Sequence, residues 1–144
     1  MKLITLNTWG GQIFEPLMRF VEQHATEADI FCFQEMLFGD SPDFTPVYRA
    51  RLNLYIEVAK KLAGFTGFQH RASEAEYFPN EPLKGIVGQA IFVRDGLGVK
   101  AHGGFQACRD LPGNTAFGGK VTGRCQWVEF EDNSIVLNVH GLWQ

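Results

Sequence analysis

Residues 29–36 read DIFCFQEM, an apolar run in which apolar and polar side chains do not alternate. A strand that faces water on one side alternates, so this run predicts a strand that is covered on both faces. A chain with such a strand needs a layer of structure on each side of a sheet. At 144 residues, of which 45% are hydrophobic, the chain is long enough for one domain with a sizeable core.

The periodicity around this strand predicts the order strand, helix, strand, helix and then a run of strands. Apolar residues recur at helical spacing within residues 15–27 and again within residues 47–63, where Gly64 ends the second helix. The predicted strands are residues 2–7, 29–36, 65–72, 85–94, 99–108, 121–131 and 134–140. This order favours an α/β (α+β) fold with about one mixed β-sheet and two helices on one face.

The second half of the chain has no further helical pattern, so the other face of this sheet is expected to be bare. An exposed apolar face of that size favours association. We therefore expect a homodimer or a bound second half of the fold.

Composition restricts the function. The net charge of −3 argues against binding long nucleic acid through phosphates alone. The three cysteines have neither zinc-site nor disulfide-framework spacing. No apolar run reaches the roughly 18 residues of a membrane span. The opening MKLITLNTWGG does not resemble a signal peptide, so the expected location is the cytoplasm.

Candidate site residues stand at strand ends. Asn7 ends the first predicted strand, Glu35 ends the second and His140 ends the last. Where parallel strands share a sheet edge, a carboxylate and a carboxamide form an oxygen-rich site suited to Mg²⁺. His140 could donate to a phosphoryl oxygen or protonate a leaving group. The alternative is that Glu35 is an exposed strand-end acid, Asn7 a turn former and His140 a histidine without a chemical role.

Two glycine-containing segments are further candidates for ligand binding, and each can also be a plain turn or loop. Gly96, Gly98 and Ala101 form G-x-G-x-x-A after a strand, but no helical period follows, so this is a hairpin turn and not a dinucleotide-binding motif. Residues 108–120 (CRDLPGNTAFGGK) contain Arg109, Asn114 and Lys120. They either help to hold phosphate or form a plain solvated connection.

The segments LNTWGG, FCFQEM, GQAIFVR and LNVHGLWQ follow one another in the order of known motifs. In this the chain resembles the endonuclease/exonuclease/phosphatase superfamily, to which deoxyribonuclease I, abasic-site endonucleases, sphingomyelinases and inositol polyphosphate phosphatases belong. The resemblance implies part of a deoxyribonuclease I-like sandwich and a metal-dependent phosphoester hydrolase. Its substrate is then a nucleic acid, a phospholipid head group or a phosphorylated small molecule.

The resemblance also implies roles for the candidate residues. Glu35 is then a direct ligand of Mg²⁺ or Mn²⁺, Asn7 helps to place the metal and the phosphate, and His140 contacts the phosphate and assists the leaving group. A further glutamate that supports the site corresponds to Glu74 or Glu76, between which the sequence does not decide.

The family's later motifs, G-D-x-N and S-D-H, are missing from the sequence. We therefore expect residues 1–144 to be the N-terminal part of one such domain, with little or no turnover. The alternative is a complete small non-enzymatic α/β module that binds a protein partner or itself through its open sheet face.

Overall fold

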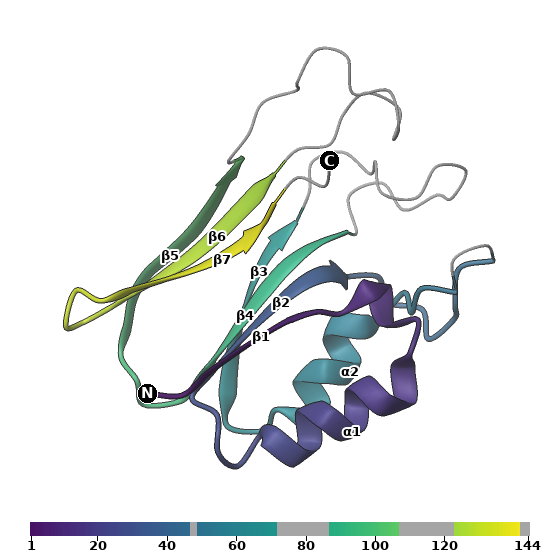
Figure 1. Ribbon diagram of the computed structural model, residues 1–144, viewed down its shortest axis with the longest axis horizontal. Coiled ribbons are helices and arrows are strands. Elements are labelled where there is room, and N and C mark those ends of the chain that lie inside the picture. The colour runs from purple at the N-terminus through teal and green to yellow at the C-terminus, as the bar shows by residue number, and fades with distance from the viewer. Residues whose placement is uncertain (47–48, 72–86, 107–122, 142–144) are drawn as a thin grey trace.

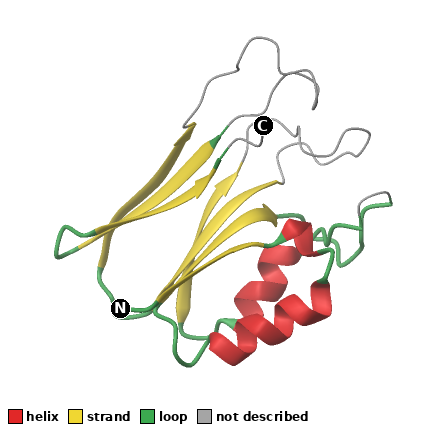
Figure 2. Ribbon diagram, in the orientation of Figure 1, coloured by secondary structure: helices red, strands yellow, loops and turns green. Residues whose placement is uncertain are grey.

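The computed structural model describes residues 1–46, 49–71, 87–106 and 123–141, and these form two layers of strands with helices on one side (Figures 1 and 2). The first sheet has the strand order β1-β2-β4-β3. β1 is parallel to β2, whereas β4 runs antiparallel between β2 and β3. Its strands are β1 (Leu3–Asn7), β2 (Ile30–Leu37), β3 (Phe65–Arg71) and β4 (Val87–Arg94). The central strands β2 and β4 are buried on both faces, which confirms the interpretation of the apolar run.

Two helices, α1 (Phe14–His24) and α2 (Leu54–Lys61), cover one face of this sheet (Figure 2). Phe31 and Phe33 of β2 and Phe92 of β4 form the apolar core beneath them. The α+β class and the placement of both helices on one face are therefore as predicted. Of the helices that the structure describes, none has the length and hydropathy of a bilayer-spanning segment.

The helix boundaries differ from the predicted ones. The first helix ends at His24 and not at residue 27. The second begins at Leu54 and not at residue 47, because Arg49 has a φ of 53°. A right-handed helix cannot contain that conformation.

The partial sandwich that the resemblance implied is present, but the expectation of a bare inner face is wrong. The later strands form a separate antiparallel sheet with the order β5-β6-β7. Its strands are β5 (Val99–Gln106), β6 (Arg124–Phe130) and β7 (Ile135–His140). Val128 and Phe130 of this sheet pack with Ile30, Cys32, Ile91 and Val93 of the first. The apolar face that the sequence left bare is thus covered by the chain's own second sheet.

The turn that contains Gly96 and Gly98 is where the chain passes from the first sheet to the second. Gly96 and Gly98 have φ values of 91° and 62°, in the left-handed region that glycine adopts without a steric cost. β4 and β5 lie in different sheets, so the turn between them is a corner of the sandwich and not a hairpin. β5 follows it directly, and the absence of a dinucleotide-binding helix here is as predicted.

The interior of the sandwich changes character along the strands. One end is the apolar cluster just described, and the other is a layer of amides. Gln34 donates to Asn138 Oδ1 at 2.5 Å, and Asn138 donates to the carbonyls of Phe33 at 3.0 Å and Ala90 at 3.3 Å. Gln89 donates to the Asn138 carbonyl at 3.0 Å. Hydrogen bonds between β7, β2 and β4 therefore tie the two sheets together at this end.

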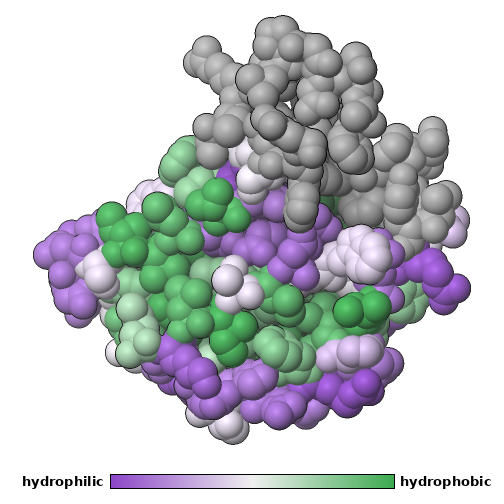
Figure 3. Space-filling view, viewed as in Figure 1, coloured by the Kyte–Doolittle hydropathy of each residue, from purple (hydrophilic) through white to green (hydrophobic). Residues whose placement is uncertain are grey.

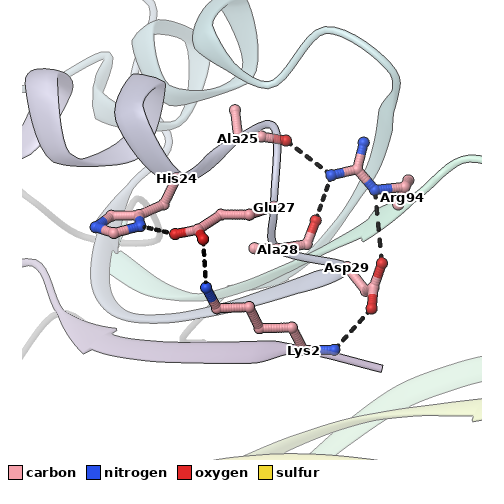
Figure 4. A network of polar contacts seen from close by, with 7 residues as sticks. All are labelled: Lys2, His24, Ala25, Glu27, Ala28, Asp29 and Arg94. Carbon is pink, nitrogen blue, oxygen red and sulfur yellow. Dashed lines mark hydrogen bonds and ion pairs between the residues drawn. The ribbon is translucent and has the colours of Figure 1, made fainter.

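A second polar network closes the opposite end of the first sheet (Figure 4). Arg94, the last residue of β4, donates from Nη2 to the carbonyls of Ala25 at 2.8 Å and Ala28 at 2.5 Å. Its Nε lies 3.7 Å from Asp29 Oδ1, and Asp29 also accepts from the Lys2 amide at 2.7 Å. Arg94 thereby joins the connection between α1 and β2 to the end of β4.

Candidate active site

Three strands each bring one polar residue to the amide end of the sandwich. Asn7 is the last residue of β1, Glu35 lies near the end of β2 and His140 is the last residue of β7. Because β1 is parallel to β2 and β7 lies over β2, these strand ends meet. The structure thus brings together the three residues predicted from the sequence, whose chemical roles stay predictions.

Glu35 is the centre of the cluster. Asn7 Nδ2 donates to Glu35 Oε1 at 3.0 Å, and His140 Nε2 lies 3.4 Å from the same oxygen. The Trp9 amide donates to Asn7 Oδ1 at 2.8 Å, which orients the Asn7 side chain with its NH₂ group toward Glu35. The Glu35 side chain is only 14% exposed. It is therefore not the solvated strand-end acid of the alternative interpretation.

These contacts keep the carboxylate ionised. Burial on its own raises the pKa of Glu35, but hydrogen bonds from His140 and Asn7 act in the opposite direction and prevail, so its pKa is below the usual value. From the described residues, both contacts fall on Oε1. Oε1 is thus the atom through which Asn7 and His140 hold the carboxylate.

A β-bulge aims Glu35 at the site. Phe33 pairs with Ala90 and Met36 with Gly88, so Gln34 and Glu35 together oppose the single residue between them on β4. Glu35 has a φ of 56°, a conformation that costs a non-glycine residue energy. Bulges re-aim side chains next to functional sites, and here the strained residue is the candidate metal ligand.

Thr8 holds this bulge in place. Its hydroxyl lies 2.8 Å from the Gln34 carbonyl and 3.0 Å from the Glu35 carbonyl, to either of which it can donate, and its backbone N–H donates to the Gln34 carbonyl at 3.0 Å. Thr8 is 2% exposed, so these bonds are shielded from water. The bulged residues thereby gain partners that the β4 ladder does not give them.

Sequence reasoning missed the polar residues beneath the site. Asn138 precedes His140 by two positions and therefore shares its face of β7, a period-two signal that could have revealed it. Arg124 pairs with His140 across β6 and β7, is 8% exposed and so places a buried cation beside the site. Its charge adds to burial in lowering the pKa of His70. Arg124 is the first residue of β6 and lies inside the predicted strand 121–131, where no pattern marks it as buried.

The described residues offer one carboxylate at this site, which is the smallest number with which a divalent ion such as Mg²⁺ commonly binds. Among the described residues, no group of three His, Cys, Asp or Glu side chains could hold a metal ion. Glu35 offers an ionised carboxylate, and Mg²⁺ commonly binds to one or two carboxylates while it keeps waters and substrate phosphate. A metal ion bound to Glu35 would therefore need further ligands from elsewhere.

Several predicted residues lie outside the described part of the chain. These are the two alternatives for the supporting glutamate and the three residues of the loop 108–120, namely Glu74, Glu76, Arg109, Asn114 and Lys120. Their predicted roles therefore stay predictions.

No protein-family model matches this sequence, and no curated protein matches it. The structure is similar to that of an endonuclease/exonuclease/phosphatase family protein from Leptotrichia buccalis C-1013-b, with a TM-score of 0.55 and 16% sequence identity. The similarity covers 100% of this chain and 55% of that one, so this chain spans about half the length of the similar protein. The described part of the chain thus has the fold of about half of an endonuclease/exonuclease/phosphatase family protein.

Proposed function

We propose that this fold serves a metal-dependent phosphoester hydrolase of the nuclease or phosphatase type, in which Glu35 anchors Mg²⁺ or Mn²⁺. The observation that carries the proposal is the carboxylate of Glu35, held by Asn7 and His140 at the end of β2. Ligands of α/β sheets bind at the carboxyl ends of strands. The similarity of fold adds the class of reaction.

The proposed roles of the residues follow from the hydrogen-bond donors and metal ligands that they carry. A bound divalent ion neutralises charge on phosphoryl oxygens and activates water. Asn7 Nδ2 and His140 Nε2 both lie within 3.4 Å of Glu35 Oε1, so either N–H can reach a phosphoryl oxygen bound beside that carboxylate. His140 is also suited to protonate the leaving oxygen. With one carboxylate at this site among the described residues, the 144-residue chain alone is expected to turn over slowly or not at all.

Charge narrows the proposed substrate. The net charge of −3 gives the chain no overall attraction for long duplex nucleic acid. Arg124 is a buried cation next to His140 in the strand register and suits a single phosphate group. We therefore favour a small phosphoester or a lipid head group over long duplex DNA.

Calorimetric titration with Mn²⁺ tests the proposal. The unmodified chain is expected to bind Mn²⁺, and Glu35→Gln to bind it at least about tenfold more weakly, because a neutral amide replaces the anionic ligand. Glu131→Gln is the matched control, since Glu131 is an exposed acid one residue past β6, at the end of that strand away from His140. Equal binding by the unmodified chain and Glu35→Gln would refute the role of Glu35.

Hydrolysis is measured on the same proteins with an activated phosphodiester and an activated phosphomonoester, each with and without metal. Metal-dependent turnover that disappears in Glu35→Gln supports the proposed reaction. Metal-dependent turnover that Glu35→Gln retains places the chemistry elsewhere.

A further inference from the structure

One residue of the second sheet makes hydrogen bonds all around the bulge of β2. Asn138 Nδ2 donates to the carbonyls of Phe33 at 3.0 Å and Ala90 at 3.3 Å, which form the last regular pair before the bulge. Its Oδ1 accepts from Gln34, one of the two bulged residues. Its backbone carbonyl accepts from Gln89, the residue of β4 opposite the bulge. Asn138 is thus hydrogen-bonded to both strands of the bulged pair.

These contacts are shielded from water. Asn138 and Gln89 are fully buried and Gln34 is nearly so. The Gln34 side chain also donates to Thr5 Oγ1 at 3.1 Å, so it links β7 to β1 as well as to the bulge. A buried polar group that loses its partner has no water to replace it, which destabilises any backbone arrangement that breaks the contact. The backbone at the bulge is therefore tied to the position of Asn138.

The bulge needs this support because Glu35 has a conformation that residues with a side chain rarely adopt. Its φ is 56°, and such strained conformations persist only where the surrounding contacts impose them. Thr8 contributes contacts from one side, through the Gln34 and Glu35 carbonyls. Asn138 contributes them from the second sheet, through the Phe33 carbonyl and the Gln34 side chain. The two residues that precede Glu35 are thus both fixed by Asn138.

The neighbouring residue on β6 makes an ordinary amide contact between the sheets. Gln126 pairs with Asn138 in the strand register, is equally buried, and donates from Nε2 to the Phe68 carbonyl at 2.8 Å. Phe68 belongs to β3, which pairs with β4 without a register shift. Gln126 and Asn138 are therefore alike in burial and in the type of bond, but within the described part of the chain only Asn138 bonds to the bulge.

The same strand also contacts the carboxylate itself. His140 follows Asn138 by two positions on the same face of β7, and its Nε2 lies 3.4 Å from Glu35 Oε1. On the surface, hydrophilic residues gather near the carboxyl ends of β1 and β7, beside a band of hydrophobic residues (Figure 3). One register of β7 over β2 therefore sets both the backbone of the bulge and the surroundings of the carboxylate at this polar end.

We propose that Asn138 is a positioning residue for Glu35, which fixes from the second sheet the bulge that directs the carboxylate toward Asn7. In this role Asn138 touches neither a metal ion nor a substrate. Its effect on metal binding rests on the proposed function, in which Glu35 anchors Mg²⁺ or Mn²⁺. Loss of a residue that orients a metal ligand typically weakens metal binding by about 10- to 100-fold.

Nuclear Overhauser spectroscopy of the metal-free chain tests the positioning. The side-chain amide protons of Asn7 are expected to show a contact with the Cγ protons of Glu35, because Asn7 Nδ2 lies 3.0 Å from Glu35 Oε1. Asn138→Leu keeps the approximate size of the side chain but removes its donor and acceptor, so this contact should be lost. Gln126→Met is the matched control and should retain it. Asn138→Ala leaves room for water at the freed carbonyls and gives a second, milder test.

Contacts between the rings of Phe31 and Phe65, whose centroids are 5.7 Å apart in the apolar core, show in each variant that the chain is folded. An Asn7–Glu35 contact that both folded Asn138 variants retain, or that Gln126→Met loses equally, would overturn the proposal.

Titration with Mn²⁺ separates this proposal from the proposed function. Asn138→Leu is expected to bind Mn²⁺ at least about tenfold more weakly than the unmodified chain, and Gln126→Met to bind it equally well. If the unmodified chain does not bind Mn²⁺, the proposed function fails, while the Overhauser contacts still decide the positioning. Loss of the Asn7–Glu35 contact with unchanged Mn²⁺ affinity would overturn the link to metal binding.

Discussion

The amide of Asn7 and the carboxylate of Glu35 are 28 residues apart in the chain and 3.0 Å apart in the structure. The parallel pairing of β1 with β2 sets Asn7 opposite Gln34, so a regular strand would direct the Glu35 side chain to the other face. The bulge directs the Glu35 side chain to the same face as Asn7. The contact between the two residues is therefore the product of one backbone irregularity.

The left-handed backbone conformation of Glu35 predicts that glycine at this position is more stable than alanine. In the left-handed region alanine costs about 1 kcal/mol more than glycine, so Glu35→Gly is expected to be about 1 kcal/mol more stable than Glu35→Ala. Chemical denaturation of both variants measures the difference. At Glu129, within the regular part of β6, glycine should instead be less stable than alanine. The same order at both positions would contradict the assigned conformation.

Stability should depend on pH through Glu35. Its pKa in the folded chain is below the usual value of 4.5, so the ionised carboxylate stabilises the fold above about pH 4.5. That contribution is lost as the pH falls through the folded-state pKa. Urea denaturation at pH 6.5 and at successively lower pH should show a steeper loss for the unmodified chain than for Glu35→Gln. Parallel curves for the two proteins would exclude the linkage.

Cys32 should be chemically inert in the folded chain. Burial raises the pKa of its thiol to about 12, and only the thiolate reacts with alkylating agents. Iodoacetamide at pH 8 followed by peptide mapping is expected to label Cys32 only in denaturant. Labelling of Cys32 under native conditions would mean that the space between the sheets opens.

Arg94 should stabilise the fold through its carbonyl contacts. Arg94→Met removes the hydrogen bonds to Ala25 and Ala28, and hydrogen bonds that involve a charged group are worth about 1.5–3 kcal/mol. The free energy of unfolding is therefore expected to fall by about 2 kcal/mol. Arg19→Met, on the exposed surface of α1, serves as the control and should change stability by less than about 0.5 kcal/mol.

Thr8 should position Glu35 as well as stabilise the fold. Thr8→Val keeps the shape but removes the hydroxyl that bridges the Gln34 and Glu35 carbonyls, whereas Thr8→Ser keeps it. Thr45→Val removes another buried hydroxyl, which accepts from the Ala50 amide and, among the described residues, has no hydrogen bond to Asn7, Gln34 or Glu35. Both valine variants are expected to lose about 1 kcal/mol of stability. Only Thr8→Val should shift the NMR signals of the Asn7 and Glu35 side chains.

Sequence patterns predicted the local elements and the site residues because these depend on neighbours along the chain. The apolar run before Glu35 identified β2 as a buried strand, and the positions of Asn7 and Glu35 at the ends of two parallel strands predicted that both lie at one edge. The division into two sheets was not predictable in this way. It depends on the corner at Gly96 and Gly98, and a glycine pair after a strand is equally typical of a hairpin.

The bulge and the amide layer were beyond pattern reasoning for a different reason. Nothing in FCFQEM marks an extra residue, because the run is apolar on both faces and has no alternation to interrupt. Gln34 and Asn138 meet only once the second sheet lies over the first. Such contacts between distant segments are set by tertiary packing.

The extra residue in β2 also shifts, by one position, the alternation of side chains between the two faces of the strand. After Gln34 and Glu35, Met36 returns to the helix-facing side that Phe31 and Phe33 occupy, although it is an odd number of positions from them. The bulge thus lets one strand meet two requirements: Phe31, Phe33 and Met36 pack in the core, and Glu35 lies beside Asn7. Deletion of one of the two bulged residues would leave a regular strand, which keeps Met36 on the helix-facing side but no longer directs a carboxylate toward Asn7.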